Sequence, residues 1–83
     1  MTQVIRSAAQ LGTVIRNERL LRNLTQQQLA DFTGTGQKTI SQIETGHAGA
    51  RLDTIFRLLA VLGLEIAFSP RDVGADGNLG DVF

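Results

Sequence analysis

The stretch L-T-Q-Q-Q-L-A-D-F-T-G-T-G-Q-K-T-I-S-Q-I-E-T-G, residues 24–46, decides the fold of this chain of 83 residues. Thr25 followed three positions later by Gln28 forms a capping box, which predicts a helix over residues 26–32. Residues 33–36, T-G-T-G, predict a turn. Residues 37–45 then predict a second short helix, so two short helices are joined by a tight turn.

The second of these helices has two chemically different faces. Ile40 and Ile43 lie three positions apart and are expected to point inward. The polar residues lie towards the other side and carry amide, ammonium and hydroxyl groups: Gln37, Lys38, Ser41 and Gln42. Such groups match base edges in the major groove of DNA, and base-reading residues gather at the N-terminal end of a recognition helix. We therefore expect a helix-turn-helix unit that reads DNA with this face.

The start of the first short helix is a second expected point of contact with DNA. Backbone amides at a helix N-terminus point at whatever lies in front of it, and a DNA phosphate suits that position. Thr25 and Gln26 are expected to anchor phosphates, whereas Gln27 is expected to be plain exposed surface. The full set of expected DNA contacts is Thr25, Gln26, Gln37, Lys38, Thr39, Ser41, Gln42, Thr45 and Arg22.

Two further helices are expected to flank this unit. Ser7 and Gln10 form a second capping box, and the apolar residues after it suit a helix over residues 8–22 that ends at Asn23. Its apolar positions are Leu11, Val14, Ile15 and Leu21. Residues 52–62 predict a fourth helix, closed by Gly63. Its expected inner face holds Ile55, Leu58, Leu59 and Leu62.

The hydrophobic period changes after Gly63. Apolar and other residues alternate strictly over residues 64–68, which predicts one strand, although a continuation of the fourth helix is the alternative. A lone strand has unpaired edges, so we expect it to pair with the same strand of a second subunit across a two-fold axis. The expected dimer interface comprises Leu64, Ile66, Phe68, Phe56 and Leu59.

Length and composition indicate one small domain. We expect an N-terminal arm over residues 1–6, a DNA-binding and dimerisation domain over residues 7–68, and a flexible tail over residues 69–83. There is no cysteine, which excludes a disulfide framework and a thiolate metal site. The N-terminus has no long apolar run, so no signal peptide or membrane span is expected, and a cytoplasmic location fits best.

The formal net charge is zero, but the charges are unevenly distributed. Residues 1–63 carry a net charge of +3, and residues 64–83 carry a net charge of −3. A mildly basic body with an acidic tail is compatible with DNA binding. Taken alone, however, the charge pattern favours ordinary solvated charge, and so it does not decide the function.

The motifs L-T-Q-Q-Q-L-A (residues 24–30) and T-I-S-Q-I-E-T-G (residues 39–46) resemble the Xre/Cro-type helix-turn-helix domain of phage repressors. The resemblance covers residues 11–63 and implies a mostly α, lambda-repressor-like helix-turn-helix fold of four or five helices, which the short C-terminal strand predicted over residues 64–68 follows. It implies an ion pair between Arg19 and Glu44, for which an exposed surface pair is the alternative. It further implies base readers at Gln37, Lys38 and Gln42, with Gln26 as the helix-opening glutamine.

The chain also resembles HipB-type antitoxins. The shared features are the S-x-x-Q-L start, the R-L-D-T-I-F-R-L-L helix (residues 51–59) and the L-G-L-E-I-A-F strand (residues 62–68). This resemblance implies a homodimer joined through the strand, a HipA-type toxin kinase as partner, and repression of the toxin–antitoxin operon. One departure is Gly36, which stands where a Ser or Thr usually caps the recognition helix. The alternatives are a stand-alone phage-like repressor and a protein-interaction module that has lost DNA binding.

The last fifteen residues are rich in glycine and aspartate. Such a segment cannot offset its own ordering entropy, so it is either a loose end or a tethered ligand. In the second interpretation Leu79, Val82 and Phe83 bind the toxin, and Asp76 and Asp81 face basic groups on it.

No enzyme, metal or cofactor is expected. The sequence has no evident nucleophile–base pair or catalytic carboxylate pair. His47 is the only histidine and has no partner at ligand spacing, so it is expected to be a loop residue that touches a phosphate. The segment G-T-G-Q-K-T (residues 34–39) lacks the spacing of a phosphate-binding loop.

Overall fold

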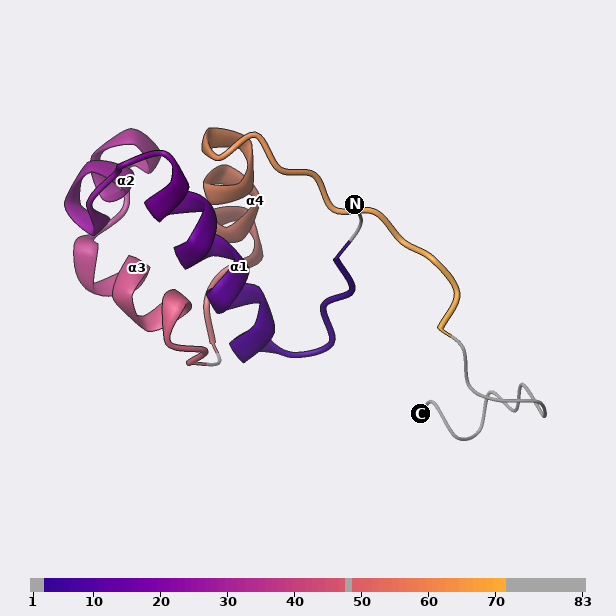
Figure 1. Cartoon of the computed structure of the whole chain (residues 1–83). Helices are drawn as coiled ribbons and strands as arrows, with labels where there is room; N and C mark the ends of the chain where they lie inside the picture. Colours follow the sequence, from indigo (N-terminus) through magenta and orange to yellow (C-terminus); the bar gives the residue numbers. More distant parts are fainter. Residues whose placement is uncertain (1–2, 48, 72–83) are drawn as a thin grey trace.

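The computed structural model of the chain describes residues 3–47 and 49–71, which contain four helices (Figure 1). These are α1 (Ala8–Leu21), α2 (Gln26–Thr33), α3 (Gln37–Glu44) and α4 (Leu52–Val61). Helix α1 packs on α3, and α2 packs on both α3 and α4. The expected mostly helical architecture is therefore confirmed, and each helix end lies within one residue of its predicted position.

Local side-chain chemistry accounts for where the helices begin and end. Thr25 and Gln28 form the expected capping box, with the backbone N–H of Gln28 donating to Thr25 Oγ1 at 3.0 Å and that of Thr25 donating to Gln28 Oε1 at 2.8 Å. Ser7 caps α1 as predicted, but the Gln10 side chain accepts from the backbone N–H of Arg6. Asn23 has φ 55°, the left-handed conformation that stops α1.

A single apolar core lies between the helices. Its fully buried side chains are Ile15, Leu29, Ile40, Leu58 and Leu62, with Ala30, Ile43, Ile55 and Leu59 around them. Leu21, one of the apolar positions that indicated this helix, lies outside the core, with its side chain 74% exposed. Leu21 follows Ile15 by six positions, which turns it by about 240° around the helix axis and away from the core.

The segment after α4 is not helical. Gly63 has φ 71°, and α4 ends at Val61, so the alternative of a continued helix is wrong. Leu64 is half-buried against the core, and its backbone N–H donates to the carbonyl of Leu59 at 2.8 Å. The expected strand is not formed within residues 64–68 of this single chain, and its pairing in a dimer remains a prediction.

Two residues expected at the dimer interface differ in exposure. Phe56 is 51% exposed on α4, whereas Leu59 is 5% exposed and belongs to the core of its own chain. Leu59 belongs to the same buried cluster as Ile55 and Leu62, and α4 packs against α2. Of these two α4 residues, only Phe56 therefore offers a substantial apolar surface to a second subunit.

Gly12 allows α1 and α3 to approach closely. A Cβ atom at this position would overlap the carbonyl oxygen of Ile43 and would lie 2.8 Å from the carbonyl oxygen of Glu44. Both neighbours are backbone atoms at the end of α3, and they cannot rotate away as a side chain can.

Within the described residues, no helix is long and apolar enough to cross a membrane.

We predict that Gly12→Ala destabilises the protein by about 1–3 kcal/mol, as overpacking does in other cores. In an exposed helix the same change would stabilise, because alanine has the higher helix propensity. Thermal and urea unfolding followed by circular dichroism measure the effect. The control is Gly36→Ala, whose new methyl group would meet no atom within 4 Å, so that it changes only the capping preference at the start of α3. A Gly12→Ala variant as stable as the parent would contradict the close contact.

Candidate nucleic-acid interface

The outer face of α3 carries the polar residues that the sequence placed there. Gln37, Lys38 and Gln42 are exposed, while Ser41 and Thr39 are half-buried. Ile40 and Ile43 are buried, as expected from their spacing. Gly36 is the N-cap of α3 and makes no side-chain capping bond, so the start of this helix presents only backbone groups and the side chains of its first turn.

Thr45 is exposed, but its hydroxyl is already occupied. Thr45 Oγ1 donates within the helix to the carbonyl oxygens of Ser41 at 3.0 Å and Gln42 at 3.1 Å, and it lies 2.9 Å from Nδ1 of His47. These contacts tie the end of α3 to the following loop. The structure therefore gives Thr45 a local structural role besides the DNA contact that the sequence predicts.

The expected ion pair between Arg19 of α1 and Glu44 of α3 is formed, and it is buried. Arg19 Nε lies 2.7 Å from Glu44 Oε2, and Arg19 Nη2 donates to Glu44 Oε1 at 3.0 Å. The two side chains are 9% and 1% exposed, so the alternative of an exposed surface pair is wrong. The third guanidinium nitrogen donates to the carbonyl oxygen of Leu24 at 2.8 Å. The pair therefore joins α1, α3 and the turn before α2.

The hydrogen bond from Arg19 to Glu44 raises the pKa of the guanidinium above its usual value, against the lowering effect of burial. A raised pKa means that the stabilisation is fully present below the ordinary pKa of arginine and is lost only as the pH rises through the higher folded value. The guanidinium therefore stays charged at every pH at which the protein would be studied.

A line of hydrogen bonds leads from this buried pair to the outer face of α3. Gln26 Nε2 donates to Glu44 Oε1 at 3.2 Å, and Gln37 Nε2 donates to Gln26 Oε1 at 2.8 Å. The bonds bring together an expected phosphate anchor and an expected base reader, which are eleven residues apart in the sequence. Sequence spacing gave no sign of this contact, because it depends on how α2 and α3 cross.

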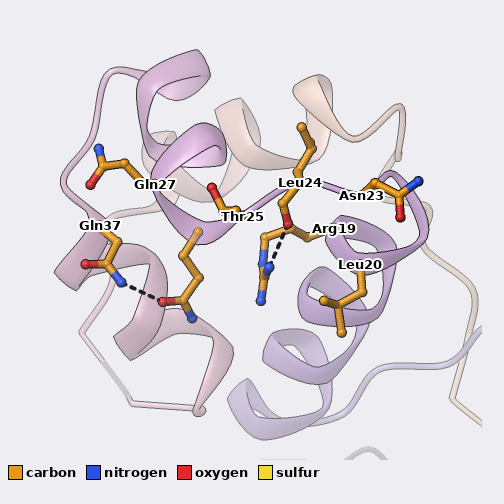
Figure 2. A pocket seen from close by; sticks show the side chains of 8 residues that line it. Arg19, Leu20, Asn23, Leu24, Thr25, Gln27 and Gln37 are labelled. Carbon is orange, nitrogen blue, oxygen red and sulfur yellow. Dashed lines mark hydrogen bonds between the residues drawn. The ribbon is translucent and has the colours of Figure 1, made fainter.

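An open groove of about 670 Å³ lies at the start of α2 (Figure 2). Its lining includes Thr25, Gln26 and Gln37, three of the expected DNA contacts, together with Leu20 and Asn23. Arg22 precedes the lining residue Asn23 in the sequence but is not itself among the residues that line the groove. Its Nη1 donates to the carbonyl oxygen of Glu18 at 2.7 Å and lies 3.4 Å from the Glu18 carboxylate. The structure thus gathers the expected phosphate anchors and a base reader around one groove.

A second groove of about 460 Å³ lies between α3 and α4. Thr39 and Gln42 line one side, and Arg51 and Arg57 line the other. Both arginines lie near Asp53, with shortest nitrogen–oxygen distances of 3.5 Å and 4.0 Å. No motif in the sequence singled out these arginines, although their spacing on either side of Asp53 is visible there.

Residues 3–47 and 49–71 contain no group of His, Cys, Asp and Glu that could hold a metal ion.

The helix-turn-helix family HTH_3 matches residues 15–68. The chain belongs to this helix-turn-helix family. The family comprises DNA-binding transcriptional regulators, and one curated relative is the uncharacterized HTH-type transcriptional regulator y4mF of Sinorhizobium fredii. It is 32% identical over 66 residues, which cover 80% of this chain and 87% of the relative.

Solved structures of this helix-turn-helix type are also similar to the chain. A chain of the HipA-HipB-O2-O3 complex is 32% identical with a TM-score of 0.76, over 83% of this chain and 97% of that chain. The HipB-O4 20mer complex gives the same values. These relatives confirm the resemblance to HipB antitoxins that the sequence motifs indicated.

The buried ion pair leads to a prediction about stability. Glu44→Ala leaves the Arg19 guanidinium buried without its carboxylate, and breaking a buried pair in this way costs about 3–5 kcal/mol. Urea unfolding of the full chain measures the loss. Glu18→Ala is the matched control, because it removes a more exposed pair between Glu18 of α1 and Arg22 at the C-cap of that helix, and it should cost about 0.5 kcal/mol or less. Equal stability of the two variants would argue against the role of the buried pair.

Proposed function

We propose that this chain is a HipB-type antitoxin, a homodimer that represses its own toxin–antitoxin operon and neutralises a HipA-type kinase. The observation that carries the DNA-binding part is the exposed polar face of α3. The buried ion pair between Arg19 and Glu44 holds this helix against α1. This role places the protein in the cytoplasm together with its operator.

The proposed docking on DNA follows from the two grooves. Helix α3 enters the major groove with Gln37 and Lys38 leading, and Ser41 and Gln42 follow one turn later. Thr25 and Gln26 meet a phosphate at the start of α2, where backbone N–H groups of the helix point outward. Arg51 and Arg57 are then close to the phosphates on the other side of α3.

The proposed homodimer is supported by apolar side chains that the single chain leaves uncovered. Phe56 is 51% exposed, Ile66 is 43% exposed and Phe68 is 97% exposed. Leu64 packs against the core at the start of the segment that contains Ile66 and Phe68. A second copy that pairs along residues 64–68 covers these side chains and presents two recognition helices to DNA.

The proposed antitoxin role rests on the similarity to HipB, which extends over most of this chain. The toxin-binding residues proposed from the sequence are Leu79, Val82 and Phe83, and they lie outside the described residues. A stand-alone repressor without a toxin is the second candidate, because the curated relative is described only as a transcriptional regulator.

We predict that Gln37→Ala and Lys38→Ala each weaken operator binding by about 1–3 kcal/mol and relax the preference at one or two base pairs. The operator is expected to be an inverted repeat that takes one dimer, with half-sites about one helical turn, roughly 34 Å, apart. Binding selection from random duplexes gives the site, and fluorescence anisotropy gives affinity and stoichiometry.

Asn17→Ala is the control for this experiment, since Asn17 is exposed on α1 and lines neither groove. It should leave affinity within a factor of about two, as surface substitutions usually do. Unchanged affinity in both the Gln37 and Lys38 variants would refute the proposed reading face.

The antitoxin proposal predicts that tagged full-length protein purified from its source cells carries a HipA-type kinase, identified by mass spectrometry. Deleting residues 78–83 should lower kinase recovery about tenfold or more while operator affinity stays unchanged, since the apolar end of the chain is the proposed anchor. Full recovery of the kinase by the shortened chain would refute the tail as anchor. Operator binding with no kinase in either preparation would favour the stand-alone repressor.

A further inference from the structure

The groove between α3 and α4 carries more positive than negative charge. Among the described residues, none that lines it is acidic, and Arg51 and Arg57 lie on its α4 side. The carboxylate beside both arginines is that of Asp53, at 3.5 Å from Arg51 Nε and 4.0 Å from Arg57 Nη2. The two arginine side chains are 82% and 55% exposed, and a guanidinium group has more N–H donors than one shared carboxylate can bind. The groove can therefore bind a further anionic group.

A group bound in this groove would lie in the proposed path of DNA. Thr39 and Gln42 line its α3 side, and both are expected DNA contacts. Arg51 and Arg57 are proposed to lie close to phosphates beside α3. An anionic segment on these arginines would take the positions of the phosphates, so the segment and DNA would exclude each other.

The chain itself contains a segment of complementary charge. We call residues 72–77, D-V-G-A-D-G, the acidic segment; it has two carboxylates and no cation, and it lies outside the described residues. Residues 1–63 carry a net charge of +3 and residues 64–83 a net charge of −3, so the end of the chain complements its body. A group tethered to the molecule that binds it has a high effective concentration, and weak ion pairs then suffice for docking.

The chain is long enough for this contact. Leu64 packs against the core just after α4. Helix α4 has ten residues, so its far end is about 15 Å away. Asp72 follows Leu64 by eight residues, which span up to about 26 Å when extended. Asp76 follows Phe68 by eight residues, so an equal length remains available if residues 64–68 pair in the dimer.

We propose that the acidic segment docks in the groove between α3 and α4 and competes there with DNA phosphates. Its two aspartates, Asp72 and Asp76, pair with the two arginines of the groove. The docking is independent of the proposed function, whereas the competition rests on it. Asp81 belongs to the apolar end of the chain that is proposed to anchor the kinase, so deleting residues 78–83 leaves the docking intact.

The first experiment contains no DNA. The chain has no cysteine, so Ala75→Cys supplies a unique site for a nitroxide spin label within the acidic segment of the full-length protein. We expect the label to broaden the backbone amide NMR signals of Thr39 and Arg57, which line the groove, much more than that of Arg16, which is exposed on α1 and lines neither groove. Changing both aspartates to asparagine should abolish this difference, and changing both to glutamate should preserve it.

The second experiment measures the competition by fluorescence anisotropy with a random DNA duplex at low salt. The variant with both aspartates changed to asparagine should bind about fivefold more tightly than the parent, within the range that two exposed ion pairs give. In a background of Arg51→Gln and Arg57→Gln, the same change should alter the affinity by less than about twofold, because the coupled partners are gone. Simple repulsion between an acidic tail and DNA would give the same gain in both backgrounds.

The outcomes separate this inference from the proposed function. Broadening confined to the groove in a protein that binds no duplex would refute the proposed DNA binding and support the docking. Equal broadening at the groove and at Arg16 would overturn the docking, even in a protein that binds its operator. An equal gain in DNA affinity in both arginine backgrounds would overturn the competition. Circular dichroism establishes that each variant is folded.

Discussion

The ion pair between Arg19 and Glu44 is the interaction on which the rest of the structure depends. Helix α3 has eight residues and no side-chain cap, and a helix so short has little stability in isolation. Its position is therefore imposed by contacts with its neighbours. The ion pair ties its last residue to α1, Ile40 and Ile43 enter the core, and Gly12 lets the two backbones meet. Together these contacts determine which side of α3 faces outward.

A buried ion pair is costly to desolvate, so its retention needs an explanation beyond attraction. Here each guanidinium nitrogen has a partner: the guanidinium binds both carboxylate oxygens and a backbone carbonyl, and Gln26 supplies a further donor to the carboxylate. Among the described residues, no buried side-chain nitrogen or oxygen lacks a partner. An apolar pair of equal volume would fill the space, but it would not orient Gln26. The directional bonds link the core to the surface that we propose reads DNA.

Sequence chemistry predicted what depends on neighbours along the chain, and missed what depends on crossing helices. The caps at Ser7 and Thr25 and the left-handed Asn23 and Gly63 follow from local residue types, so the four helices were predictable. The Arg19–Glu44 pair was predictable only through family resemblance. The contact of Gln26 with Gln37 and the second groove arise from helix crossing. The close approach of helices at Gly12 was indicated in the sequence only by a lone glycine within a helical pattern. The strand predicted over residues 64–68 is not formed in the single chain, and its pairing with a second chain stays a prediction.

The charges at the interface explain why hydrogen bonding must contribute much of the recognition. Arg22 lies beside Glu18, and Arg51 and Arg57 lie beside Asp53, so acidic neighbours partly offset three of the cations near the grooves. Salt-dependent affinity for DNA grows with the number of phosphates that cations neutralise. A surface with few unopposed cations gains little affinity for arbitrary sequences. Under the proposed function, discrimination between sites therefore depends on amide and hydroxyl groups, and two of these amides, those of Gln26 and Gln37, are joined to Glu44 by hydrogen bonds.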